Sequence, residues 1–147
     1  MPHLSDNPAI TKATARQITR LDLQQRLDAG LNPLTDMAAM ELDASPVPDR
    51  PAAILVPLLR SAGYWHVLMT KRAKHLAHHA GQISFPGGKL EPDDDGPVSA
   101  ALREAFEEVR LMPQTVSIAG GLDALRSPAG FIVQPIVGIV DGDDGLD

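Results

Sequence analysis

One uninterrupted apolar run, Ala52–Leu59, constrains the fold of this chain more than any other feature. Pro51 precedes it and a Ser-Ala-Gly turn follows it, and both its length and these boundaries are typical of a buried β-strand, even though it contains Pro57. A second extended segment, Tyr64–Thr70, comes directly after the turn. We therefore expect the two segments to form a hairpin-like pair with which the compact part of the chain begins.

The clearest helix is predicted over Pro97–Val109. Pro97 stands where an early-turn proline is tolerated, and Asp94 or Asp95 can cap the helix. An amphipathic leader helix is expected at about residues 18–27, where apolar residues recur among Arg and Gln and a Gly-Leu-Asn-Pro sequence ends the pattern. Further extended segments are predicted at residues 83–85, 116–119 and 131–140, and the run Pro86-Gly87-Gly88 is expected to break the chain.

Length and composition limit the kind of protein this can be. A chain of 147 residues fits one domain with a sizeable core, expected at 51–147, after a helical leader and a proline-rich linker over residues 1–50. The absence of cysteine excludes thiolate metal sites and fits a reducing cytosol. We find no signal-peptide pattern and no apolar stretch near the roughly 20 residues of a membrane span. A cytoplasmic protein that does not bind membranes is expected.

The charge is unevenly distributed. A net charge of −6 argues against nucleic-acid binding. Residues 51–90 contain five cations and no acid, whereas from Glu91 onward twelve acids accompany three arginines. A basic segment beside an acidic one suits an anionic substrate that the first segment grips and that a metal bridges to the second, although chance patchiness explains the charges about equally well.

The helix predicted over Pro97–Val109 carries three carboxylates on one face. At about 100° per residue, Glu108 lies near 40° and Glu107 near 300° from Glu104. The opposite face, between about 100° and 200°, is apolar and is expected to meet the core; its residues are Val98, Leu102, Ala105, Phe106 and Val109. Like charges three and four residues apart destabilise a helix, and a divalent cation with oxygen ligands would offset that.

The alternative is a solvated acidic face, which the spacing alone favours. The upstream context changes that balance, because Gly87 and Gly88 allow the backbone to approach a ligand closely and free a carbonyl for a metal. Arg103 has a structural role available as well, a bidentate pair with a loop carboxylate such as Asp95.

Two longer stretches identify a family. Residues 88–111 resemble the Nudix box, in which Gly is followed after five residues by Glu, and seven residues later by Arg-Glu-apolar-x-Glu-Glu-x-Gly-apolar. The sequence from Leu68 to Lys89, with its His-Ala-Gly-Gln-Ile-Ser-Phe-Pro-Gly-Gly run, is similar to the coenzyme A pyrophosphatase branch of that family. The resemblance extends from about Ala52 to Val140.

Three departures from the box pattern stand out. Gly88 and Asp95 are separated by six residues instead of five, and Asp replaces Glu. Arg110 stands where the pattern has Gly at the helix end. If that position needs a left-handed conformation, Arg costs on the order of 1 kcal/mol relative to Gly. The final seven residues look like a loop, and we expect the strand and helix that usually close the family fold to be missing from this sequence.

The resemblance implies an α+β fold, a Nudix-type α/β/α sandwich with a mixed central sheet and a catalytic loop-helix. It implies that Glu104 and Glu108 bind Mg²⁺ or Mn²⁺ with help from Glu107 and the Gly88 carbonyl, that Arg103 belongs to the catalytic unit, and that Glu104 is the first candidate for the general base.

The implied substrate is coenzyme A or an acyl-CoA, cut to 3′,5′-ADP and 4′-phosphopantetheine or its acylated form. Cations and a histidine upstream of the box are candidates to bind it: Arg72, Lys71, Lys74 and His79. Their alternative is solvent exposure, and a zinc site among the histidines lacks a fourth ligand. The sequence leaves open a homodimer, a Nudix hydrolase for ADP-ribose or an oxidised nucleotide, and a catalytically weak nucleotide-binding module.

Overall fold

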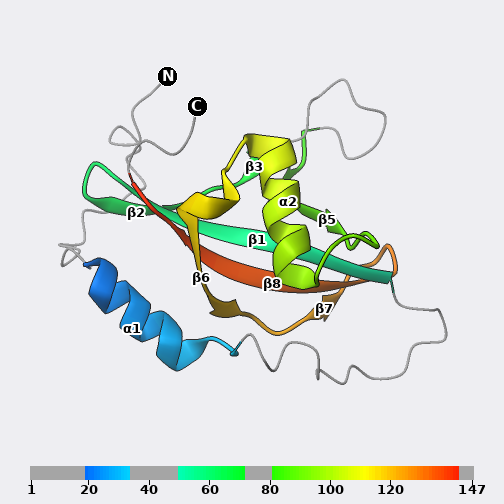
Figure 1. The fold of residues 1–147 in the computed structure, drawn as a ribbon, viewed down its shortest axis with the longest axis horizontal. Helices are drawn as coiled ribbons and strands as arrows, with labels where there is room; N and C mark the ends of the chain where they lie inside the picture. The colour runs from blue at the N-terminus through cyan, green and yellow to red at the C-terminus, as the bar shows by residue number, and fades with distance from the viewer. Residues whose placement is uncertain (1–18, 34–49, 72–80, 143–147) are drawn as a thin grey trace.

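The protein is built around one mixed six-stranded sheet. The computed structural model describes residues 19–33, 50–71 and 81–142. Four strands follow each other in the order β2-β1-β8-β6, while β5 pairs with β1 and β7 with β8. Their bounds are β1 Arg50–Ser61, β2 Tyr64–Val67, β5 Gly87–Lys89, β6 Val116–Gly121, β7 Leu125–Arg126 and β8 Phe131–Val140. Among the described strands of this sheet, only β1 and β8 run parallel to each other, and the other pairs are antiparallel (Figure 1).

Pro57 is tolerated in β1 because of where it lies along the strand. On one side β1 pairs continuously with β8, but on the other side it pairs first with β5, as far as Ile54, and then with β2, from Leu58. Leu55 donates its N–H to Pro86, so the missing N–H of Pro57 points to the same side, where the Pro57 carbonyl oxygen accepts the N–H of Leu68, just beyond the end of β2. The proline thus lies where the ladder between β1 and β2 ends.

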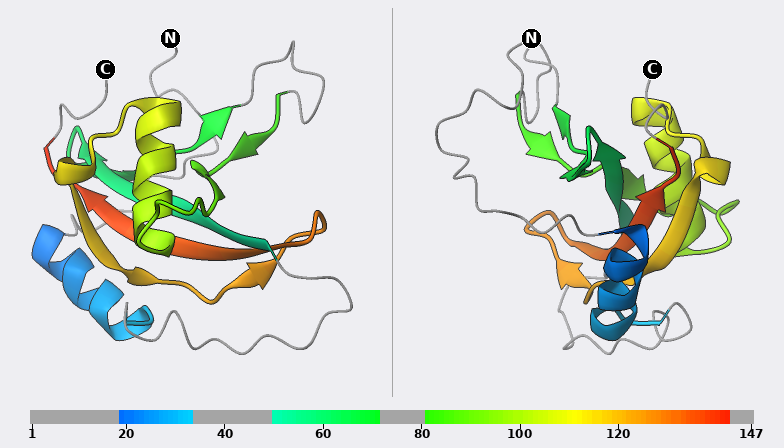
Figure 2. Two further views of the ribbon diagram at one scale, coloured as in Figure 1. Left: turned by 45° about the vertical axis from the view of Figure 1, so that its right-hand side comes forward. Right: turned by 90° about the vertical axis from the view of Figure 1, so that its left-hand side faces the viewer.

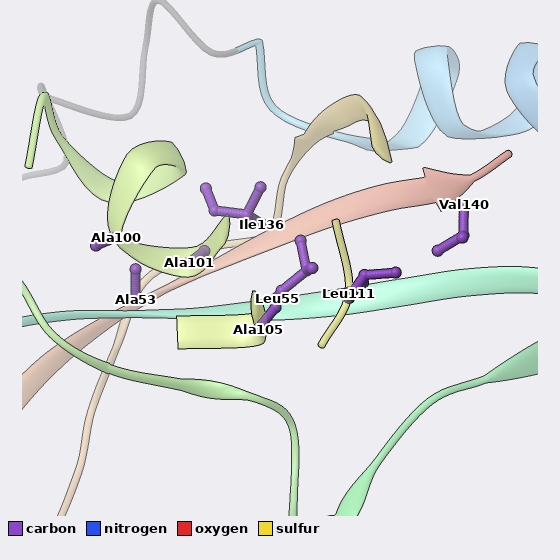
Figure 3. Close-up of a cluster of buried hydrophobic side chains, with 8 residues drawn as sticks. All are labelled: Ala53, Leu55, Ala100, Ala101, Ala105, Leu111, Ile136 and Val140. Carbon is purple, nitrogen blue, oxygen red and sulfur yellow. The ribbon is translucent and has the colours of Figure 1, made fainter. Parts of the chain in front are cut away.

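Helix α2, Pro97–Val109, covers one face of this sheet (Figure 2), and its bounds are those predicted. The cap was predicted wrongly, because Gly96 and not Asp94 or Asp95 is the N-cap residue, and no side-chain hydrogen bond caps the helix. Three alanines of α2 are fully buried against the sheet, and they form the core with residues of β1 and β8 (Figure 3). The buried cluster is Ala53, Leu55, Ala100, Ala101, Ala105, Leu111, Ile136 and Val140.

The buried stripe of α2 differs from the predicted one. Ala100 and Ala101 lie at about 320° and 60° on the helical wheel, so the face turned to the sheet includes the position of Glu104. Phe106, expected in the core, is 37% exposed, whereas Val98, Leu102 and Val109 are partly buried at the margin of the cluster. Alanine has no bulk to keep the helix away from the sheet, and this brings Glu104 close to the strands.

The segment Pro86-Gly87-Gly88 does not break the chain as predicted. Gly87 and Gly88 begin strand β5, which pairs with β1 so that Gly88 lies opposite Ala53. A side chain on Gly87 would collide with the carbonyl oxygen of Ala53, so glycine is what permits this strand pair. A separate two-stranded sheet, β3 Thr70–Lys71 and β4 Ile83–Ser84, precedes it.

The β1–β2 hairpin was predicted correctly, although β2 ends at Val67 and not at Thr70. Its two central turn residues, Ala62 and Gly63, both have positive φ values, 51° and 82°. Two such residues make the turn whose twist matches that of the flanking strands. The hairpin brings Arg60 of β1 directly opposite Trp65 of β2.

Helix α1, Arg20–Gly30, lies beside β6 (Figures 1 and 2). Thr19 and Asp22 cap it reciprocally, and the chain leaves it at Asn32, which exchanges two backbone hydrogen bonds with Gly121. The expected amphipathic character is absent, because no residue of α1 is buried and Leu21 is 67% exposed. Among the described residues, neither α1 nor α2 is long and apolar enough to cross a membrane.

Arg110 ends α2 in the left-handed conformation, with φ 58° and ψ 25°. Its N–H bonds to carbonyls of the last helical turn, and a short 3₁₀ turn, η3 Pro113–Thr115, then leads into β6. The guanidinium lies 5.5 Å from the ring centroid of Phe106. The conformation that makes Arg unfavourable is therefore present, and the cation–π contact offsets part of its cost.

We expect Arg110→Gly to be more stable than Arg110→Ala by about 1 kcal/mol, because both lose the contact with Phe106 and only Gly adopts positive φ freely. Chemical denaturation of both variants measures the difference. Equal stabilities would show that the left-handed residue carries no strain.

Candidate functional site

The candidate site forms where β5 meets α2. Glu104 projects from the sheet-facing side of α2, and its side chain is 17% exposed. A Cβ on Gly88 would lie 2.5 Å from its Oε1 atom, closer than side chains tolerate. The backbone of Gly88 and the Glu104 carboxylate are therefore in direct contact. That the glycine also lets a ligand or a metal approach the backbone stays a prediction. Residues 88 and 104 are brought together by the pairing of β5 with β1.

Arg103 ties the loop after β5 to the helix. Its Nε and Nη2 atoms donate to the two carboxylate oxygens of Asp94 at 3.0 and 2.9 Å, a bidentate pair. Nη2 also donates to the carbonyl oxygen of Lys89 at 3.1 Å, next to Gly88. Nη1 donates to Glu104 Oε1 at 3.1 Å and lies 3.4 Å from Glu107 Oε1. One guanidinium thus connects the strand, the loop and two carboxylates of α2.

The loop partner of Arg103 was predicted wrongly. The sequence suggested Asp95, but Asp95 is exposed and Asp94 makes the bidentate pair. Asp94 also accepts a hydrogen bond from the N–H of Glu91 at 2.8 Å, which closes the loop. Five residues separate Gly88 from Asp94, the spacing of the box pattern, so the additional residue of this sequence follows the carboxylate and does not precede it.

The charges of this pair stabilise each other. The side chain of Asp94 is only 4% exposed, and the hydrogen bonds from Arg103 lower the pKa of its carboxyl from the usual value, against the effect of desolvation. The pKa of Arg103 is raised for the same reason, first by Asp94 and further by Glu104. Both groups stay ionised throughout the physiological range.

The other two box carboxylates are more open. Glu107 is 54% exposed, and Glu108 is exposed one helical turn beyond Glu104. Within residues 19–33, 50–71 and 81–142, no three acidic or histidine side chains are already gathered tightly enough to enclose a metal. The face predicted for Glu104, Glu107 and Glu108 exists, but Arg103 shares it with them.

Of the residues predicted to bind substrate, Lys71 is among the described ones. Arg72, Lys74 and His79 lie outside the described residues, and so do His75 and His78. Lys71 is exposed at the end of β3 and pairs with Ile83 of β4, the strand that leads through Pro86 to Gly88. Its role therefore stays a prediction.

Sequence analysis missed a cation pair near the site. Arg50 of β1 and Lys89 of β5 lie 4.0 and 5.7 Å from the ring centroid of Phe131 in β8. Arg50 also donates to the carbonyl oxygen of Ala129 at 2.6 Å. Lys89, beside Gly88, was the only signal in the sequence. Arg50 and Phe131 are remote in the chain and come together only through the pairing of β1 with β8.

The fold and the site together define a class: an α+β sandwich whose glycine-bearing strand and acidic helix are connected by a loop that an arginine fixes. The family model described as NUDIX domain matches residues 48–137. The chain therefore belongs to the NUDIX domain family, and its fold is the Nudix-type sandwich that the sequence predicted.

Relatives and solved structures agree with this assignment. A protein of Yersinia pestis (strain Pestoides F) named Uncharacterized Nudix hydrolase NudL is 48% identical over 92 residues, 63% of this chain and 46% of that protein. A protein of the same name from Yersinia pseudotuberculosis serotype O:1b has the same identity and coverage. The chain thus spans about half the length of the curated relatives it matches.

Solved structures support the fold. The Ap4A hydrolase of C. elegans has a TM-score of 0.55 at 21% identity, covering 68% of this chain and 74% of that one. The NUDIX domain of Shewanella oneidensis NrtR, complexed with ADP ribose, has a TM-score of 0.51 at 16% identity over 76% of this chain and 73% of that one. Identities this low show a shared fold and nothing finer.

We predict that Asp94→Asn destabilises the protein by on the order of 2 kcal/mol at pH 7, because the hydrogen bonds from Arg103 lose a charged acceptor. The pKa of Asp94 is lowered in the folded state, so its ionised form contributes stability above the usual value near 4. That contribution is lost as the pH falls through the lower folded pKa. The difference between wild type and variant should therefore be constant near pH 7 and shrink below about pH 4.

Asp95→Asn is the matched control, because Asp95 neighbours Asp94 in the chain and is exposed. Denaturation curves of the three proteins between pH 3 and pH 7 make the comparison. Equal losses from the two substitutions would contradict the assignment of Asp94 as the partner of Arg103.

Proposed function

We propose that this protein hydrolyses the diphosphate bond of a nucleotide derivative with the help of a divalent cation. The observation that carries the proposal is the contact of the Glu104 carboxylate with the Gly88 backbone. Arg103 holds the two together by bonding to Glu104 and to the carbonyl of Lys89, next to Gly88. Membership of the NUDIX domain family supports the reaction class. Because the chain spans about half the length of its relatives, the activity of the whole protein belongs to the proposal.

The residues present fit Mg²⁺ or Mn²⁺. The side chains that would hold the cation are Glu104 and Glu108, assisted by Glu107 and the Gly88 carbonyl, and all of these donors are oxygen atoms, which hard cations prefer. Mg²⁺ keeps several of its waters and uses one or two carboxylates together with substrate phosphates. The loose arrangement of acids among the described residues is therefore compatible with it.

The bound cation would polarise the diphosphate and lower the pKa of the attacking water. The protein itself orients the acidic groups: the hydrogen bond from Arg103 Nη1 to Oε1 keeps Glu104 turned toward Gly88. We propose Glu104 as the group that accepts the proton of the water, since it is the least exposed carboxylate of the three. Arg103 acts as a positioning residue through Asp94 and Glu104.

Coenzyme A or an acyl-CoA is the proposed substrate. Support comes from the residue run between Leu68 and Lys89, which resembles the coenzyme A pyrophosphatase branch. The products would be 3′,5′-ADP and 4′-phosphopantetheine or its acylated form. Lys71 ends strand β3 and Lys89 ends strand β5 beside Gly88. We propose that both contribute to binding of the phosphates together with Arg72, Lys74 and His79.

The decisive assay incubates the protein with coenzyme A and Mg²⁺ or Mn²⁺ and identifies the products by mass spectrometry. We expect cleavage to 3′,5′-ADP and 4′-phosphopantetheine, its abolition by chelator, and a loss of at least about 100-fold in Glu108→Gln, since catalytic metal ligands contribute several kcal/mol. Asp93→Asn, a change of an exposed loop carboxylate, is the control and should retain activity.

The outcomes separate the parts of the proposal. Cleavage of ADP-ribose or a nucleoside triphosphate with coenzyme A untouched would retain the chemistry and overturn the substrate. Turnover that persists in chelator would contradict the role of the metal. Binding of nucleotide and metal without turnover would favour the binding-module alternative.

A second prediction concerns Gly88. In Gly88→Ala the new methyl group must displace the Glu104 carboxylate, so we expect Mn²⁺ to lose its stabilising effect on thermal unfolding and turnover to fall at least about tenfold. Gly30→Ala is the matched control, because a Cβ there meets nothing within 4 Å. A Gly88→Ala protein that still gains stability from Mn²⁺ would show that Glu104 is not a ligand.

A further inference from the structure

A polar pocket lies at the other end of the sheet from the Gly88–Glu104 contact. It has a volume of about 430 Å³, and its walls include Arg20 of α1, Arg60 at the end of β1, Trp65 of β2 and Ile139 of β8. Arg60 is seven residues beyond Ala53, the partner of Gly88, which corresponds to about 23 Å of extended strand. β2 and β5 are accordingly at opposite ends of the molecule in Figure 1.

Most walls of the pocket belong to the opposite face of the sheet, although Val140 at the end of β8 also lines it and packs with the cluster under α2. Residues alternate between faces along β1, and Ala53 and Leu55 contact α2. Arg60 is an odd number of residues from Leu55, so its side chain lies on the other face. Ser117 of β6 lies on that face too, because its neighbours Val116 and Ile118 pack on the α2 side. A ligand in this pocket would therefore be separated from the candidate active site by the sheet itself.

Arg60 is the unusual residue of the pocket. Its Nε atom is buried, and no described residue accepts a hydrogen bond from it. Its guanidinium forms no ion pair with an acid of the described residues either. Buried polar groups are almost always satisfied, and a half-buried cation without a counter-charge is unfavourable unless an anion accompanies it.

Arg20 supplies a second guanidinium in a fixed position. Its Nη1 lies 2.5 Å from Asp141 Oδ1, and its Nη2 donates to Ser117 Oγ at 3.3 Å. Asp141 balances the charge of Arg20, so among the described residues the charge of Arg60 leaves the pocket with one cation in excess. Two guanidinium groups from different elements offer more donors than the two oxygens of a carboxylate can use, and they suit a phosphate group.

The remaining walls are apolar. Trp65 stands directly opposite Arg60 in the hairpin, and Ile139 is fully buried beside them. An indole next to a phosphate-binding cation favours a ligand with a flat or apolar part beyond its phosphate.

We propose that this pocket binds the phosphate group of a small molecule, with Arg60 as its principal cation and Arg20 as a second donor. The site is independent of the proposed catalytic function. Free phosphate and a nucleotide both carry the phosphate group that the two arginines would bind. Only the nucleotide also has a flat base on which Trp65 can stack.

The chain's single tryptophan makes the pocket directly observable, because Trp65 is one of its walls. Inorganic phosphate, AMP and acetate are titrated into the protein in the presence of EDTA, followed by tryptophan fluorescence and by calorimetry. We expect saturable binding of phosphate, binding of AMP roughly fivefold tighter or better with quenching of Trp65, and weaker binding of acetate. Equal affinities for phosphate and AMP would assign the site to free phosphate.

Arg60→Gln should weaken binding of phosphate and AMP roughly tenfold or more, and Arg60→Lys should restore part of it. Arg26→Gln is the control of equal charge change, on an exposed position of α1 outside the pocket. Absence of binding by both methods, equal weakening by the two Gln substitutions, or acetate binding as tightly as phosphate would each overturn the proposal.

Discussion

The bidentate pair between Arg103 and Asp94 is the interaction on which the candidate site depends. Asp94 closes the loop on the N–H of Glu91, and Arg103 bonds at the same time to the Lys89 carbonyl and to Glu104. The loop has no regular structure of its own, so its position relative to α2 comes from one nearly inaccessible carboxylate and one guanidinium. Breaking such a pair leaves a charge with poor access to water, which is why each partner keeps the other in place.

Small residues make this arrangement possible. The alanines of α2 allow the helix to lie directly on β1 and β8. Because the helix is so close, the Glu104 carboxylate fits only if position 88 has no side chain, and glycine provides that space. Glu104 is thus pressed onto a strand backbone although it belongs to the stripe that faces the core. A carboxylate that is partly shielded and held from one side has fewer orientations to lose when it binds a ligand.

Much of this could be predicted from the sequence, and the reasons for the failures are physical. The bounds of α2, the hairpin after β1 and the long strand β8 follow from apolar runs and turn residues, which act locally. The strand at Gly87 was missed because it forms only by pairing with β1, and glycine has no strand preference of its own. The helical wheel gave weight to large apolar residues, whereas alanines are what the sheet contacts. Asp94 and Asp95 are adjacent acids, and only the folded loop distinguishes them.

The junction between α1 and the sheet has a consequence for the behaviour of the chain in solution. β6 is an outer strand, and the two hydrogen bonds between Asn32 and Gly121 occupy part of its free side. Gly120 permits this, since a Cβ there would lie 2.8 Å from the Asn32 carbonyl oxygen. Open outer strands are templates for pairing with another copy of the same chain. The bridge after α1 therefore covers part of this edge, and we expect a protein trimmed to start at β1 to expose it to pairing with another copy.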